Sequence, residues 1–154
     1  MLFRSEQVST DLTRAGWSHF DHKADMGIRG AGATLAEAFE QAALGLTAII
    51  TSADVAERTT VEVECSAPDA ELLLVDWLNA LIFEMATRRM LFGGFTVTLS
   101  GRDGEMRLRA EARGEPVDRS RHQPAVEVKG ATYTALEVRH DAAGGWLVQC
   151  VVDV

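Results

Sequence analysis

Apolar residues recur along the chain with two different spacings, and these spacings predict an alternation of strands and helices. Residues 17–20 and 26–29 are short apolar segments typical of two strands. From residue 34 to about residue 50, apolar side chains recur every three or four positions, which predicts an amphipathic helix. Thr34 and Glu37 stand in the capping-box pattern that begins such a helix.

A second helix is predicted after a strand in the middle of the chain. Residues 59–65 alternate strictly between polar and apolar side chains, as a half-exposed strand does. Pro68 then interrupts the chain, and a broad apolar stripe over residues 73–85 predicts a largely buried helix. Asp76 lies inside that stripe. It is either a carboxylate at the exposed edge of the helix or a buried structural or site carboxylate.

The last third of the chain has the pattern of a β-rich region. Alternating apolar residues are separated there by glycine-containing turns. The expected elements are a hinge at residues 93–94, a hairpin over residues 95–113, a polar loop over residues 114–124, a long strand over residues 125–140 with a bulge at Gly130, and a last strand over residues 146–152.

This order of elements predicts an α+β fold in a single domain. Two helices are expected to pack on a mostly antiparallel or mixed β-sheet. Residues 1–16 are expected to be a weakly structured leader, and residues 17–154 the folded domain. A chain of 154 residues is long enough to bury a substantial core.

The charge of the chain restricts the partners that it can bind. Fifteen Lys and Arg against 23 Asp and Glu leave a net charge of −8, with a pI near 4.9. Most non-specific affinity for nucleic acid comes from cationic side chains, so this chain is a poor candidate for binding nucleic acid alone. A protein partner, a metal ion or a small molecule fits better. Local basic patches could still contact nucleic acid; they contain the arginines at positions 107, 109, 113, 119 and 121.

Sequence features predict a protein of the cytoplasm with no membrane segment. The first 17 residues contain charged side chains and no continuous apolar region, unlike a signal peptide. No apolar run approaches the roughly 20 residues that span a bilayer. Cys65 and Cys150 are isolated from each other, and two buried free thiols are expected.

The candidate chemistry lies before the first helix and at the end of the last strand. His22 and Asp25 could form the imidazole–carboxylate pair of a general base, or His22 could be a structural histidine. Asp153 either points into a site or is a solvated chain end. Carboxylate oxygens suit Ca²⁺ or Mg²⁺ better than zinc. The sequence has no zinc spacing, no nucleophile motif, and no phosphate-loop spacing among its glycines.

Several motifs occur together over residues 20–154, in one order and spacing. They are Asp21-His22-x-Ala24-Asp25, Thr34-Leu35-x-Glu37-Ala38-Phe39-Glu40, Glu71 to Asn79, Gly114-Glu115, Asp118, His122, Glu127 to Tyr133, Gly145-Trp146 and Val152-Asp153-Val154. With this set, the chain resembles the archease family. It departs from the family pattern at Lys23, where threonine is usual, and at Thr134, where histidine is frequent. Lys23 would place a cation beside the site.

The resemblance implies an accessory protein of an RNA ligase rather than an enzyme. Archeases assist the GTP-dependent RtcB-type tRNA-splicing ligase by promoting guanylylation of the ligase and repeated turnover. Their divalent-metal site, usually described with Ca²⁺, would here use Asp25, Asp153 and the carbonyl or terminal carboxylate of Val154, with Mg²⁺ or Mn²⁺ as alternatives. Asp21 and His22 would orient the ligands or face the partner. The chain would contact nucleic acid only through the ligase.

Two other functions stay open from the residues themselves. One is a metal-dependent phosphohydrolase, with His22 as base and Asp25 and Asp153 as metal ligands. The other is a chaperone-like binding module that uses the apolar second helix. The resemblance favours the ligase activator, and it makes one structural prediction: the last strand must run beside the segment that ends at Asp25.

Overall fold

A computed structural model describes residues 11–102 and 104–154 of the chain. The sequence forms eight strands and three helices within these residues. In chain order they are β1 (Gly16–His22), β2 (Asp25–Gly32), α1 (Leu35–Ile50), β3 (Thr59–Ala67), α2 (Ala70–Arg88), β4 (Met90–Arg102), β5 (Glu105–Pro116), α3 (Arg119–His122), β6 (Gly130–Ala131), β7 (Glu137–His140) and β8 (Trp146–Asp153).

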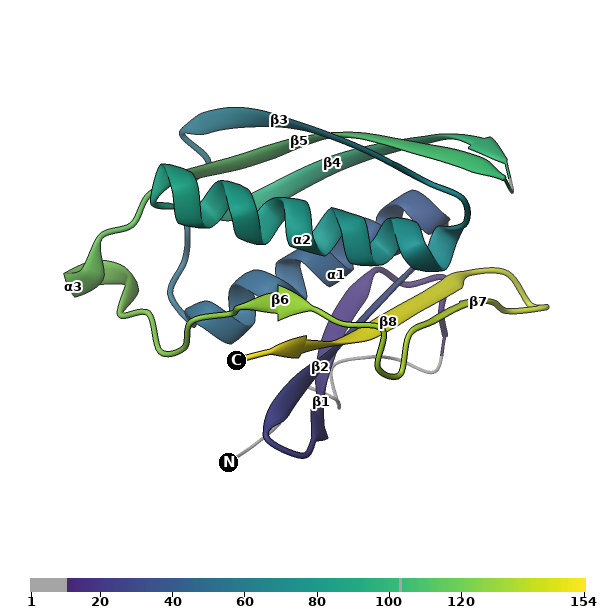
Figure 1. The fold of residues 1–154 in the computed structure, drawn as a ribbon, viewed down its shortest axis with the longest axis horizontal. Coiled ribbons are helices and arrows are strands. Elements are labelled where there is room, and N and C mark those ends of the chain that lie inside the picture. The colour runs from purple at the N-terminus through teal and green to yellow at the C-terminus, as the bar shows by residue number, and fades with distance from the viewer. Residues whose placement is uncertain (1–10, 103) are drawn as a thin grey trace.

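The strands form two antiparallel sheets, and the long helices α1 and α2 lie between them (Figure 1). One sheet has the order β1-β2-β8-β6, with β7 also paired to β8, and the other has the order β3-β5-β4. The α+β prediction is confirmed, but the single expected sheet is two sheets. Each sheet buries one face against the helices, and Trp77, Phe39 and Phe92 are fully buried in the core that results.

Helix α1 begins where the capping box predicts. The Glu37 amide donates to the Thr34 hydroxyl at 3.1 Å, and the Glu37 carboxylate accepts from the Ala33 amide at 2.8 Å. The glutamate therefore reaches one residue further back than the usual capping box. Strand β2 packs closely on this helix at Gly30, where an added Cβ would lie 2.4 Å from the Ala38 carbonyl oxygen.

Helix α2 is the largely buried helix that its apolar stripe predicts. Asp69 caps its first turn by accepting from the Leu72 amide at 2.8 Å. The Trp77 indole donates to the Phe39 carbonyl of α1 at 3.0 Å, which joins the two helices across the core. Asp76 is exposed, so the reading as an edge carboxylate is the correct one. Partial burial still raises the pKa of this carboxyl above its ordinary value.

The adjacency predicted between the two ends of the domain is confirmed. Strand β2 pairs with β8 in antiparallel register, and Met26 stands opposite Val152. Continuing this register by one residue places Asp25 opposite Asp153. Residues more than 120 positions apart in the sequence are therefore neighbours, and the register alone determines which side chains meet.

Two predictions about the β-rich region are wrong. The expected hinge at residues 93–94 is a bulge within the continuous strand β4, because the register shifts between Phe92 and Gly94. The expected long strand over residues 125–140 is two short strands, β6 and β7. A turn separates them, in which Ala135 takes a positive φ of 54° and the Leu136 amide donates to the Tyr133 carbonyl at 3.3 Å.

The expected polar loop over residues 114–124 is also more ordered than predicted. It contains the end of β5 and the short helix α3, and it buries Glu115 and His122. Of the expected leader, residues 1–10 lie outside the described residues, and Leu12 packs against Ala31 and Leu147 on the outer face of the five-stranded sheet.

Other expectations about the chain can be compared with the described residues. Cys65 and Cys150 are both free thiols; Cys150 is buried and Cys65 is half-buried. None of the described helices is both long enough and apolar enough to cross a membrane.

Candidate functional site

The candidate site residues gather where the β1–β2 hairpin meets the end of β8. A two-residue loop, Lys23-Ala24, joins the two strands, and His22 pairs with Asp25 across it. Lys23 takes a positive φ of 55° at the tip of this loop. The hairpin holds Asp25 at the first position of β2, directly beside the last residues of β8.

Strand register sorts the four ionisable candidates onto two faces of the sheet. Residues directly opposite one another in an antiparallel pair point to the same face. His22, Asp25 and Asp153 therefore share the face that points away from the helices. Asp21 stands opposite Met26, whose side chain packs against the core, so Asp21 projects from the other face. The register therefore places His22, Asp25 and Asp153 side by side on one face of the sheet and Asp21 on the other.

Asp25 is tied directly to the end of the chain. Its Oδ1 accepts a hydrogen bond from the Val154 amide at 3.4 Å, and both residues are half-buried. Asp153 is exposed, and its main chain is fixed on the other side, because its carbonyl accepts from the Lys129 amide at 2.8 Å. The backbone around the two carboxylates is thus held by strands on both sides.

The donors at this place are oxygens rather than nitrogen or sulfur. Nowhere in residues 11–102 and 104–154 do three His, Cys, Asp or Glu side chains lie close enough together to hold a metal ion. Asp25 and Asp153 can supply two carboxylates, and the main-chain oxygen of Val154 can supply a third group. A hard cation such as Ca²⁺ or Mg²⁺ is satisfied by such a set when water or a partner fills the remaining positions. The residues present therefore fit a divalent cation on an open surface.

A second polar cluster is centred on the buried carboxylate of Glu115. Arg121 donates two hydrogen bonds to it, at 2.5 and 3.0 Å. The Ala56 amide donates at 2.7 Å, and His122 Nε2 lies 3.0 Å from the same carboxylate. The Arg121 guanidinium and the Ala56 amide, together with His122, hold the pKa of Glu115 well below its usual range. Glu115 is therefore a buried anion at neutral pH.

This cluster fixes the position of α3 and the loop around it. His122 Nδ1 accepts from the Asp118 amide at 2.8 Å, so the ring donates through Nε2 to Glu115. The Thr51 hydroxyl donates to the His122 carbonyl, and the Ala125 amide donates to the Ile50 carbonyl at 2.8 Å. The segment that contains α3 is thereby bound to the end of α1.

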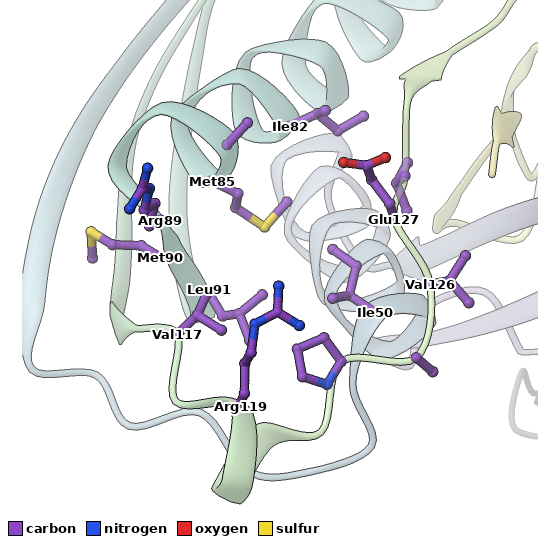
Figure 2. A pocket seen from close by; sticks show the side chains of 14 residues that line it. Ile50, Ile82, Met85, Arg89, Met90, Leu91, Val117, Arg119, Val126 and Glu127 are labelled. Atoms are coloured by element: carbon purple, nitrogen blue, oxygen red, sulfur yellow. The ribbon is translucent and has the colours of Figure 1, made fainter.

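An open groove of about 780 Å³ lies beside this cluster. The ends of α1 and α2 and the segment over residues 117–128 form its walls. Its lining is mainly apolar, with Ile50, Ile82, Met85 and Leu91 among the lining residues, and Figure 2 shows how they face one another. Arg89, Arg119 and Glu127 are the charged residues of the lining.

Sequence reasoning did not find this groove. It placed Arg119 in a basic patch and assigned no role to Arg89. Three separate segments meet to form the groove, and no periodicity within one segment reveals such a meeting. Glu115 and His122, which form the cluster beside the groove, were visible in the sequence within the segment expected to be a polar loop.

Comparisons with known proteins identify the relatives of this chain. The sequence profile of a family described as "Archease protein family (MTH1598/TM1083)" matches residues 17–154. A protein named Protein archease from Pyrococcus furiosus is 37% identical over 139 residues, which cover 90% of this chain and 98% of the relative. Another of that name from Aeropyrum pernix is 37% identical over 141 residues, covering 90% and 97% of the two chains.

A solved structure has the same fold. The solution structure of Methanobacterium thermoautotrophicum protein 1598 superposes with a TM-score of 0.76 at 31% sequence identity. The match covers 90% of this chain and 99% of that one. The arrangement of helices and sheets described above is therefore shared along nearly the whole length of both proteins.

Proposed function

This chain belongs to the archease family, and on that premise we propose that it is an accessory protein of a GTP-dependent RtcB-type RNA ligase. It promotes guanylylation of the ligase and allows the ligase to turn over repeatedly in tRNA splicing. On this proposal the chain contributes no catalytic residue of its own. Its acidic net charge of −8 suits contact with a basic partner better than direct contact with RNA.

The proposed working part is a divalent-metal site at the end of β8. Asp25 and Asp153 would hold the cation together with the main-chain oxygen of Val154. The cation would be Ca²⁺ in the first instance, with Mg²⁺ or Mn²⁺ as alternatives. When bound, the cation would supply positive charge that stabilises phosphate oxygens. His22 shares the face of these carboxylates and orients them or faces the ligase, while Lys23 places a positive charge at the loop tip.

One observation supports this proposal above the others: the register that sets Asp25 beside the end of the chain. Asp25 Oδ1 lies 3.4 Å from the Val154 amide nitrogen, although the two residues are 129 positions apart. The carboxylates of Asp25 and Asp153 carry the same charge and repel each other, so placing them side by side on the surface costs free energy. A bound cation offsets that cost, and none of the described cations pairs with Asp25 or Asp153.

The test is multiple-turnover ligation by the cognate ligase, with and without this chain. We expect the wild-type chain to raise both ligase guanylylation and the number of products per ligase. Asp25→Ala and Asp153→Ala should lose this effect while they keep the folded spectrum of the wild type. Asp54→Ala removes an exposed carboxylate elsewhere and serves as the control.

A ligase that behaves identically with and without the chain would refute the proposal. Hydrolysis of a phosphoester by the chain alone, lost in Asp25→Ala, would instead assign it to the metal-dependent phosphohydrolases. Suppression of aggregation in unrelated proteins, unchanged in Asp25→Ala, would assign it to the chaperone-like modules.

A further inference from the structure

The groove between α2, the end of α1 and the segment over residues 117–128 has an uneven distribution of charge. Arg89 and Arg119 belong to different elements, and both line it. Figure 2 shows the Arg119 side chain reaching from α3 toward the middle of the groove, and Arg89 standing at the end of α2. Glu127 is the acidic residue of the lining and comes from the segment that leads to β6.

These two arginines differ from most others in the described part of the chain. Neither Arg89 nor Arg119 has an ion pair or a side-chain hydrogen bond with any described residue. The arginines that do lie within ion-pair distance of a carboxylate are Arg58, Arg88, Arg107, Arg109, Arg113, Arg121 and Arg139. In a chain with a net charge of −8, two uncompensated guanidinium groups beside an apolar surface favour an anionic group there.

The walls of the groove are held in place before any partner arrives. The buried Glu115 carboxylate binds Arg121 and the Ala56 amide, and the Val117 amide donates to the Arg89 carbonyl at 2.9 Å. The groove therefore does not have to be ordered on binding, which lowers the entropic cost of association. Its volume of about 780 Å³ suits a few apolar side chains rather than a folded domain.

One edge of the groove adjoins the main chain at the end of β8, where the candidate metal site lies. Val128 lines the groove, and the next residue, Lys129, donates its amide to the Asp153 carbonyl at 2.8 Å. An extended chain rises about 3.3 Å per residue, so the two places lie on the order of 10 Å apart. A protein bound in the groove would lie near the main chain of Asp153, and a part of it that extends past the edge of the sheet could reach the carboxylates of Asp25 and Asp153 on the outer face.

We infer that this groove is the docking site for a segment of the ligase that carries apolar side chains and an acidic group. The inference rests on the proposed function and deepens it by assigning the surface that takes the partner. The apolar side chains pack on Ile50, Ile82 and Met85, and the acidic group pairs with Arg89 and Arg119. Docking there would hold the ligase near the end of β8, and the candidate metal site would then act on a neighbouring part of the ligase.

The first test is charge reversal in matched pairs. Arg89→Glu with Arg119→Glu reverses both groove arginines, and Arg88→Glu with Arg102→Glu makes the same change of net charge outside the groove. Calorimetric titration with the purified ligase should show a Kd at least tenfold higher for the groove pair. The control pair should stay within about twofold of the wild type, as expected for exposed charges away from the interface.

The second test blocks the apolar floor without touching a charge. Ala86→Phe on α2 places a ring in the groove, while Thr87→Phe puts the same ring on the next helical residue, outside the lining. Ala86→Phe should weaken ligase binding at least tenfold, and Thr87→Phe should not. Methyl resonances of Ile50, Ile82 and Val126 should shift when the labelled wild-type chain binds the ligase.

These experiments separate the docking inference from the proposed function. Asp25→Asn should lose activation but keep its affinity for the ligase, and the groove variants should keep the Ca²⁺ affinity of the wild type. Activation and ligase affinity that survive in both groove variants overturn the docking inference alone. A wild-type chain that does not bind the ligase overturns both. Self-association lost in the groove variants, with unchanged ligase affinity, would assign the groove to a second copy of the chain and overturn the inference.

Discussion

The metal site makes a quantitative prediction about thermal stability when Asp25 is replaced by asparagine. The Asp25 side chain is half-buried, and its one hydrogen bond to described residues, from the Val154 amide, is long at 3.4 Å. An asparagine amide keeps an oxygen that can accept this bond. Without metal, Asp25→Asn should therefore change the free energy of unfolding by no more than about 0.5 kcal/mol.

With metal, the wild type and the variant should differ. A cation that binds only the folded state adds about 2.7 kcal/mol of stability at a free concentration 100 times its Kd. For a chain of 154 residues, each kcal/mol shifts Tm by about 2–4 °C. The wild type should therefore gain about 5–11 °C in Tm. The variant lacks a carboxylate ligand and should gain little.

The assay is differential scanning calorimetry in EDTA and in Ca²⁺ at 100 times the Kd measured by titration. Asp54→Asn is the control, because it removes an exposed carboxylate at a distance from the site and should follow the wild type. An equal rise in Tm for the wild type and Asp25→Asn would refute the assignment of Asp25 as a ligand. A wild type that shows no binding heat and no rise in Tm would refute the metal site itself.

Three further predictions concern the fold and the Glu115 cluster. Gly30→Ala should destabilise the protein by about 1–3 kcal/mol in urea unfolding, because the added Cβ would lie 2.4 Å from a carbonyl oxygen of α1. Gly130→Ala is the control: its Cβ would lie 3.5 Å from the nearest atom, and it should cost less than about 0.5 kcal/mol. Trp77→Phe should cost about 1–3 kcal/mol in the same assay, because it removes the indole hydrogen bond between the helices. Glu115→Gln should destabilise the protein most at pH 7, and the difference from wild type should shrink below about pH 4.5. The reason is that folding lowers the pKa of Glu115. The stability that this carboxylate contributes is therefore lost as the pH falls from its unfolded-state pKa toward its folded-state pKa. A difference that grows on acidification would contradict this reading.

Much of the fold follows from local patterns in the sequence. The helix that begins after Thr34 and the strand over residues 59–65 were predictable because each rests on a period and a start signal within one segment. The bulge at Gly93 and Gly94 was not predictable, since two adjacent glycines are as typical of a flexible hinge as of a bulge within a strand. The turn after Ala131 was not predictable either, because Thr132 and Ala135 resemble strand or loop residues until their partner β8 is known.

The candidate site, too, was only partly predictable from local patterns in the sequence. Asp25 stood out because it lies shortly before a predicted helix. No periodic pattern in the sequence places it beside Asp153. The resemblance to archeases predicted that the two residues are neighbours, and the β2–β8 register places them side by side. The resemblance made Asp25 a metal ligand and Asp21 a neighbour that orients the ligands or faces the partner. The two differ because the hairpin register turns Asp21 to the opposite face. Which face a strand-end side chain occupies depends on pairing, and pairing is a property of the whole sheet.

The most direct test of the metal site is diffraction from crystals of the chain grown with Mn²⁺, at a wavelength where manganese scatters anomalously. We expect one strong anomalous peak within about 2.0–2.6 Å of carboxylate oxygens from both Asp25 and Asp153. Asp25→Asn crystals, grown in the same way, should lack this peak. A peak elsewhere, with no metal at Asp25 and Asp153, would show that these two carboxylates are not the metal ligands.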